Sequence, residues 1–226
     1  MPSISARFAG LHPLAALFPV DRTNPSGPFR HPIPAMPRPA GSRNADYEET
    51  RARLLAAVRA RLLAPGGARA SFRELAAAAG VSPATLRHYF KDREAVVAAT
   101  LEALHAEGLP FIAEAAMSPR GPVADSLAWF LRSIVFAWRR AGVGAAHGLG
   151  LTAGIGDPAL GAAYVNELLE PTLQAVEARL GLHVASGELR ATDLRHAALA
   201  LLSPVVLGLL HQDDLAGAKC RALALD

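Results

Sequence analysis

The stretch SFRELAAAAGVSPATLRHYF, residues 71–90, decides the fold because it contains two helix starts separated by a tight turn. Ser71 and Glu74 have the spacing of a capping box, in which the serine caps the helix and the glutamate bonds back to the cap. Ser82-Pro83 is a second start, a capping residue followed by proline at the first helical position. The stretch therefore predicts two short helices, over Phe72–Ala79 and Ala84–Phe90.

The residues between these two starts have the sizes that a helix-turn-helix requires. A small side chain lets the helices cross closely, a glycine supplies the positive φ of the turn, and two aliphatic side chains pack between the helices. These residues are Ala76, Gly80, Val81 and Leu86. Together they favour a helix-turn-helix, with an ordinary helical hairpin as the alternative.

Two more helices flank the motif. Asp46 is placed to cap a helix that extends to Leu63 and is stopped by Pro65-Gly66-Gly67. Asp92 is placed to cap another, running to about Ala106. Four helix starts in about fifty residues predict a small helical domain.

The second helix of the motif has an outward face suited to DNA. Leu86 and Phe90 recur at i and i+4 and are expected to point inward. The outward residues, and the cations before and after that helix, can donate to phosphates or base edges, and Arg87 could read a guanine bidentately. These expected contacts are Arg73, Ala84, Thr85, Arg87, His88, Tyr89, Lys91 and Arg93.

Composition and charge agree with a helical, DNA-binding chain. The 226 residues are 51% hydrophobic and only 6% aromatic, which favours an all-α protein over a β sandwich or barrel. Residues 41–95 hold ten Lys and Arg against six Asp and Glu, whereas residues 96–226 hold nine against thirteen. A basic front half indicates a polyanionic partner.

The same composition predicts a cytoplasmic protein with no membrane partner. The single cysteine, Cys220, cannot form an internal disulfide framework, which favours a reducing compartment. The longest apolar stretch, Ala197–Leu210, has 14 residues and contains Pro204, and is too short to span a membrane.

Three regions are expected along the chain. Residues 1–43 form a disordered tail, since residues 1–40 hold nine of the seventeen prolines. Residues 44–106 form the helix-turn-helix domain, and residues 107–226 form a second helical domain. Its helices are expected near Val123–Arg140, Pro158–Leu180 and Thr192–His211. The stretch Ala141–Gly156, with six glycines, has no assignment.

Residues 46–106 resemble the N-terminal DNA-binding domain of the tetracycline-repressor (TetR) family of bacterial transcription regulators. The matching residues are Ser71–Ala76, Gly80-Val81-Ser82, Thr85-Leu86, Tyr89-Phe90 and Asp92-Arg93-Glu94. The resemblance implies operator contacts from Ser71, Arg73, Thr85, Arg87, Tyr89 and Arg93. Family members commonly carry an aromatic residue where Arg87 stands and a lysine where Arg93 stands.

The resemblance also implies that the C-terminal helices bind a small effector and dimerise. Leu160–Leu180 and Leu194–Leu210 could form a four-helix interface with their symmetry mates, with Ala197, Ala198, Ala200 and Gly208 permitting close approach; burial within one subunit is the alternative. An apolar pocket would suit a hydrophobic effector. Its expected lining is Phe111, Trp129, Phe130, Ile134, Phe136, Trp138, His147, Thr152 and Tyr164.

Enzymatic functions find little support. No serine lies in a Gly-x-Ser-x-Gly setting, Cys220 has no neighbouring histidine, and no histidine pair has metal-ligand spacing, so we expect no catalytic site, metal or cofactor. The sequence predicts a dimeric, ligand-responsive repressor that binds a pseudo-palindromic double-stranded operator. The alternatives are a helical protein–protein adaptor with a degenerate helix-turn-helix and an enzyme built on a helical bundle.

Overall fold

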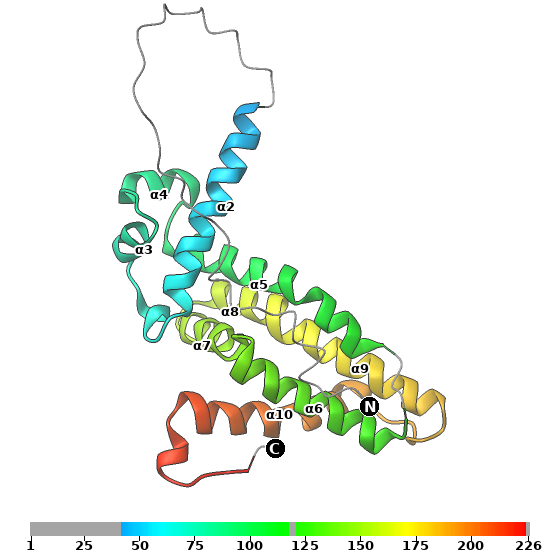
Figure 1. Ribbon diagram of the computed structural model, residues 1–226. Helices are drawn as coiled ribbons and strands as arrows, with labels where there is room; N and C mark the ends of the chain where they lie inside the picture. The colour runs from blue at the N-terminus through cyan, green and yellow to red at the C-terminus, as the bar shows by residue number, and fades with distance from the viewer. Residues whose placement is uncertain (1–41, 118–120, 225–226) are drawn as a thin grey trace, which may run out of the picture. The chain divides into compact units, whose positions relative to one another are not determined.

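The computed structural model describes residues 42–117 and 121–224, and within these ranges the chain is helical without a β strand (Figure 1). The described residues divide into two units between Thr50 and Arg51. The helices are α2 (Ser42–Leu63), α3 (Phe72–Ala78), α4 (Pro83–Tyr89), α5 (Arg93–Ala116), α6 (Val123–Arg140), α7 (Val143–Gly154), α8 (Pro158–Tyr164), α9 (Glu170–Ala185) and α10 (Leu194–Leu209). The all-α expectation is confirmed.

The first helix begins earlier than the sequence predicts. α2 starts at Ser42, so Asp46 lies inside the helix and is not its cap, and the expected cap is wrong. Residues 43–45 contain neither proline nor glycine, so nothing stops the helix from extending past Asp46. The tail predicted over residues 1–43 lies outside the described residues, apart from positions 42 and 43, which are helical.

The helix-turn-helix forms as its caps predict. Ser71 Oγ accepts a hydrogen bond from Glu74 N at 3.3 Å, and Glu74 Oε2 accepts one from Ser71 N at 2.8 Å, which completes the capping box. Ser82 Oγ accepts from Thr85 N at 3.0 Å and starts α4. Gly80 has a φ of 68°, the left-handed conformation that the turn needs. Both helices therefore begin where the sequence places them, within one residue.

A single core joins this motif to the helices beside it. Leu75 and Ala76 of α3 and Leu86 of α4 are fully buried. They belong to one cluster with Leu54 and Val58 of α2 and with several side chains of α5, α7 and α8. The helix-turn-helix is thus packed on the rest of the second unit rather than isolated from it.

Helix α5 is longer than expected, because it continues past residue 106 to Ala116 with Pro110 in its interior. Proline removes one backbone hydrogen bond but does not stop a helix held by tertiary contacts. α5 runs alongside α9 and also contacts α7 and α8 (Figure 1). The helix therefore crosses the domain boundary that the sequence predicts.

The glycine-rich stretch that the sequence leaves unassigned is a helix, α7. Two of its glycines, Gly144 and Gly150, lie where large neighbours approach too closely for a side chain. A Cβ on Gly144 would lie 2.6 Å from Trp138 Nε1, and one on Gly150 would lie 2.1 Å from Tyr164 Cδ2. Packing therefore overrides the low helix propensity of glycine.

The last two helical regions agree with the predictions in outline. α8, a π-helical segment (η2, Val165–Leu169) and α9 follow one another to Ala185, five residues beyond the expected end. α10 begins after Asp193, whose Oδ1 accepts from His196 N at 3.0 Å, and a π-helical segment (η3, Leu210–Asp214) extends it. A second core holds Phe130, Val176, Leu180, Ala198 and Leu202.

Two helical segments are long and apolar enough to cross a membrane by length and composition alone, Arg93–Ala116 and Leu194–Asp214. Neither segment is an uninterrupted apolar run, so neither stands out in the sequence. Both segments contribute buried side chains to the cores described above, among them Val96, Leu101 and Leu202. The core helix of a soluble protein meets the same criterion.

Candidate nucleic-acid interface and ligand region

Helix α4 presents the face that the sequence predicts. Leu86 and Phe90 are buried, at 0% and 2% exposure, and hold the helix to the core. The outward side chains Ala84, Thr85, Arg87 and His88 are exposed. Tyr89 is half-buried and packs at the edge of the core, so only part of its ring is available.

The hydroxyls expected to contact DNA already have hydrogen-bond partners. Ser71 Oγ donates to Glu74 Oε2 at 2.8 Å, and the hydrogen bonds from the Ser71 backbone and side chain lower the pKa of Glu74. Thr85 Oγ1 lies 2.9 Å from Ser82 Oγ. Both residues are exposed, so an incoming phosphate would meet hydroxyls whose orientation the caps already fix.

Two guanidinium groups around the motif rest on aromatic rings. Arg87 lies over the ring of Phe72, 5.6 Å from its centroid, and Arg51 lies over Phe90 at 4.9 Å. Such cation–π contacts restrict the side chain while leaving its donors available. Arg51 has no sequence signal, because its role depends on a ring almost forty residues away.

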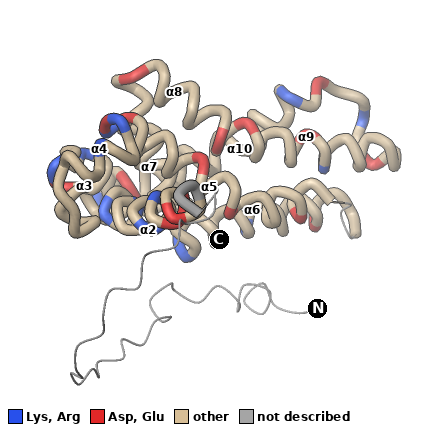
Figure 2. Tube along the Cα trace, turned by 90° about the horizontal axis from the view of Figure 1, so that it is seen from above, with Lys and Arg blue, Asp and Glu red and all other residues tan. Residues whose placement is uncertain are grey.

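The surface around the motif is strongly basic. Residues 51–93 hold nine Lys and Arg against two Asp and Glu, and Figure 2 marks these positions in blue and red. Arg73 and Lys91 are exposed, as expected for phosphate contacts. The positive charge is thus concentrated in the stretch, residues 51–93, that contains the helix-turn-helix.

Arg93 has a different environment from the one expected for a phosphate contact. Its Nε donates to the carbonyl oxygen of Ala70 at 2.8 Å, and its Nη2 donates to that of Ala68. These carbonyls belong to the residues one and three positions before Ser71, the cap of α3. Arg93 therefore ties the start of α5 to the start of α3, and its guanidinium faces backbone rather than open solvent.

The residues expected to line one ligand pocket separate into two groups. In the first, Trp138 stacks on His147 with ring centroids 4.8 Å apart, and a 2.7 Å hydrogen bond joins His147 Nδ1 to the Tyr164 hydroxyl. Burial lowers the pKa of His147 to about 4 and raises that of Tyr164 to about 12. Trp138 Nε1 donates to Asp214 Oδ2 at 3.2 Å, and burial raises the pKa of that carboxyl.

The second group surrounds a buried arginine that has no distinguishing signal in the sequence. Arg179, 4% exposed, lies 5.3 Å from the ring centroid of Trp129 and 5.7 Å from that of Phe130. Its Nε donates to the Ala115 carbonyl and its Nη1 to Ser126 Oγ, each at 2.8 Å. Burial lowers the pKa of its guanidinium. Only the spatial neighbours of Arg179 distinguish it from a surface cation.

The remaining expected pocket residues lie outside these contacts. Ile134 packs at the edge of the second core. Phe111 is 44% exposed, Thr152 is exposed and Phe136 is half-buried. The structure therefore does not gather the nine expected residues around one cavity.

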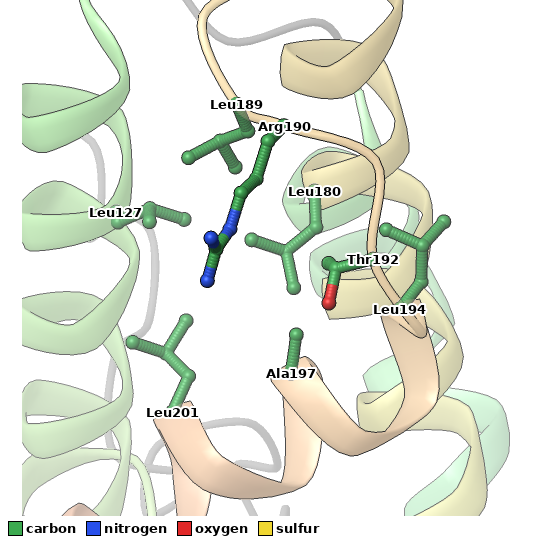
Figure 3. Close-up of a pocket in the computed structure, with 8 residues that line it drawn as sticks. All are labelled: Leu127, Leu180, Leu189, Arg190, Thr192, Leu194, Ala197 and Leu201. Atoms are coloured by element: carbon green, nitrogen blue, oxygen red, sulfur yellow. The ribbon is translucent and has the colours of Figure 1, made fainter.

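A cavity of about 240 Å³ lies elsewhere, between α6, α9, α10 and the connection before α10 (Figure 3). Its apolar lining consists of Leu127, Leu180, Leu189, Leu194, Ala197 and Leu201. Arg190 and Thr192 supply its polar groups. None of the nine expected pocket residues lines it.

Metal binding has no support in the described ranges, where no group of three His, Cys, Asp or Glu side chains could hold an ion. The only cysteine, Cys220, is exposed.

The comparisons with known proteins agree with the geometry of the motif. Residues 54–100 match the family model of bacterial regulatory proteins of the tetR family. No curated protein gives a significant match. Regulators of this family bind DNA and catalyse no reaction, which agrees with the expectation of a non-enzymatic protein.

Solved structures share the fold over most of their length. GusR of Salmonella enterica is 23% identical, with a TM-score of 0.59 over 78% of this chain and 89% of that one. A TetR-family transcriptional regulator from Mesorhizobium loti is 18% identical, with a TM-score of 0.57 over 67% and 76%. FadR of Bacillus subtilis, in complex with stearoyl-CoA, is 18% identical, with a TM-score of 0.55 over 73% and 88%. Residues 54–100 therefore match the tetR family model, and the chain shares the fold of these solved regulators.

Proposed function

We propose that this regulator is a ligand-responsive repressor that acts in the cytoplasm and binds a pseudo-palindromic operator as a dimer. The observation that carries the proposal is the exposed face of α4, with Thr85, Arg87 and His88 directed outward. Leu86 and Phe90 are buried and hold the helix to the core. A helix presented in this way fits the major groove of DNA.

The proposed contacts divide into base reading and phosphate binding. Arg87, restrained by Phe72, reads a base edge, with support from Ala84, Thr85, His88 and Tyr89 on the same helix. Ser71, Arg73 and Lys91 bind phosphates on either side. Arg93 contributes by holding the start of α3, so it acts as a positioning residue in addition to any phosphate contact.

Dimerisation is proposed through the outer faces of α9 and α10. Leu182 of α9 is 39% exposed, and Leu199 and Leu207 of α10 are 40% and 67% exposed. Ala200 is exposed between them, which leaves space for a partner helix to approach. Ala198 and Gly208 are buried within the subunit, so these two small residues pack inside it and not at the interface.

Ligand response is proposed to reach the DNA-binding helix through α5. This helix starts behind α4, at the cap Asp92, and packs against α7, α8 and α9 over its length. A ligand that shifts those helices would therefore move α5 and the α3 start held by Arg93. Coupling of this kind is typically worth about 1–3 kcal/mol, or roughly 5- to 150-fold in operator affinity. That a FadR of the same fold has been crystallised with stearoyl-CoA supports a ligand-binding role.

The test is fluorescence anisotropy with DNA from upstream of the gene, against random DNA of equal length, over a salt series. We expect a preference of about 10³-fold or more and a steep salt dependence. Arg87→Ala should weaken specific binding by about 1–3 kcal/mol, while Arg140→Ala, on the exposed end of α6, should leave it unchanged. Light scattering on the same samples measures the oligomeric state. Absence of DNA binding even at low salt would favour the adaptor alternative.

A further inference from the structure

The cavity between α6, α9 and α10 combines apolar walls with one guanidinium. Figure 3 shows the Arg190 side chain extending from the connection before α10 into the space between Leu127 and Leu201. The Thr192 hydroxyl lies across the cavity from Leu127, near Leu194. Arg190 and Thr192 are both exposed, so their polar groups are accessible to a ligand that enters the cavity from solvent.

Arg190 forms no hydrogen bond or ion pair within the described residues, in contrast to the other cations nearby. Arg195 bridges Glu170 at 2.7 Å and Glu177 at 3.2 Å. The neighbouring carboxylate of Glu188 lies 3.1 Å from His183 Nδ1 and is engaged there. The acidic groups around the cavity are therefore committed elsewhere, and the Arg190 guanidinium is available to a ligand.

The size and charge of the cavity define the class of ligand. Its volume of about 240 Å³ is below the roughly 300–1,000 Å³ of sites for drug-sized molecules, so the ligand is small. One guanidinium and one hydroxyl can satisfy the two oxygens of a carboxylate, whereas a doubly charged phosphate would need further donors. The leucine walls match a hydrocarbon group.

We propose that this cavity binds a small amphipathic monocarboxylate, with the carboxylate on Arg190 and Thr192 and the hydrocarbon between Leu127, Leu180 and Leu201. That this ligand is the effector rests on the proposed function. Binding itself does not, because the cavity belongs to α6, α9 and α10 and can be tested without DNA.

Isothermal titration calorimetry with octanoate on the full chain tests the site. 1-Octanol keeps the chain without the carboxylate, and acetate keeps the carboxylate without the chain. We expect octanoate to bind at least tenfold more tightly than either, because charge-assisted hydrogen bonds and chain burial both contribute. Arg190→Gln should weaken octanoate binding by about 10- to 100-fold. Arg132→Gln, an exposed position of α6 outside the cavity lining, should leave it unchanged.

Equal affinity for octanoate and octanol, an unchanged Arg190→Gln variant, or no octanoate binding at millimolar concentration would each overturn the proposal. Thermal unfolding of Arg190→Gln checks that the variant is folded. The operator assay separates the two hypotheses. A protein that binds its operator but not octanoate refutes the ligand site alone, whereas one that binds octanoate but no DNA refutes the proposed function alone.

Discussion

Two glycines of α7 provide a matched pair for testing the packing of the C-terminal helices. Both Gly148 and Gly150 lie inside the helix, but a Cβ at position 148 meets nothing within 4 Å. A Cβ at position 150 would lie 2.1 Å from Cδ2 of Tyr164, whose side chain is buried and bonded to His147. Alanine should therefore be tolerated at the first position and not at the second.

The expected difference in stability between the two variants follows from the displacement of the Tyr164 side chain. Both substitutions gain about 1 kcal/mol of helix propensity, which cancels in the comparison. At position 150 the ring has to move, and overpacking typically costs about 1–3 kcal/mol. Loss of the hydrogen bond to His147 leaves a buried polar atom unsatisfied, for about another 1–3 kcal/mol. Gly150→Ala should thus be about 2–6 kcal/mol less stable than Gly148→Ala.

Urea unfolding followed by far-ultraviolet circular dichroism measures this difference, with thermal unfolding as a second readout. For a chain of this size we expect the thermal unfolding midpoints of the two variants to differ by at least about 4 °C. In a Tyr164→Ala background the two substitutions should become equivalent, because the ring that clashes is gone. Two variants of equal stability in the wild-type background would refute the described packing of α7 against α8.

Three further substitutions test the start of α3 and the buried histidine. Ser71→Ala should lower the free energy of unfolding, measured in urea, by about 1 kcal/mol, since it removes the cap of α3. A loss no larger than that caused by an alanine substitution at an exposed position outside a cap would contradict the capping box. Arg93→Gln should lower stability by about 1–3 kcal/mol and weaken operator binding at the same time, because two backbone carbonyls lose their donor; weaker DNA binding at unchanged stability would indicate a phosphate contact alone. Burial holds the pKa of His147 at about 4 in the folded chain against an ordinary 6.5, so the unfolded chain takes up the proton first. The stability present above pH 6.5 should therefore fall by about 3 kcal/mol as pH drops towards 4, and His147→Gln should flatten that part of the pH profile.

The sequence predicts the DNA-binding motif well because its signals are local. Capping by Ser71, Ser82 and Asp92 involves atoms within three residues of each cap, and the turn depends on the backbone of Gly80 alone. Such interactions are present in the sequence as spacings. Where a local signal is ambiguous, as at Asp46, the same reasoning fails, because a carboxylate suitable for a cap is also tolerated inside a helix.

The ligand region could not be predicted in the same way, because its aromatic residues are close in sequence but face different neighbours. Phe130 points to Arg179 in one core, whereas Trp138, two turns further along α6, stacks on His147 in the other group. Arg190, which projects into the cavity, lies in a connection between helices and has no periodic signal. Its importance depends on which helices surround it.

The glycines of α7 explain both the missed helix and the cluster beside it. In sequence, six glycines between residues 141 and 156 argue against a helix, because each costs about 1 kcal/mol relative to alanine. In the fold, Gly144 and Gly150 leave the space that the rings of Trp138 and Tyr164 occupy. Those two rings enclose His147, which stacks on one and bonds to the other. Gly144 and Gly150 therefore weaken α7 as an isolated helix but let it pack in the fold, and their penalty in helix propensity is offset by the burial of two large aromatic side chains.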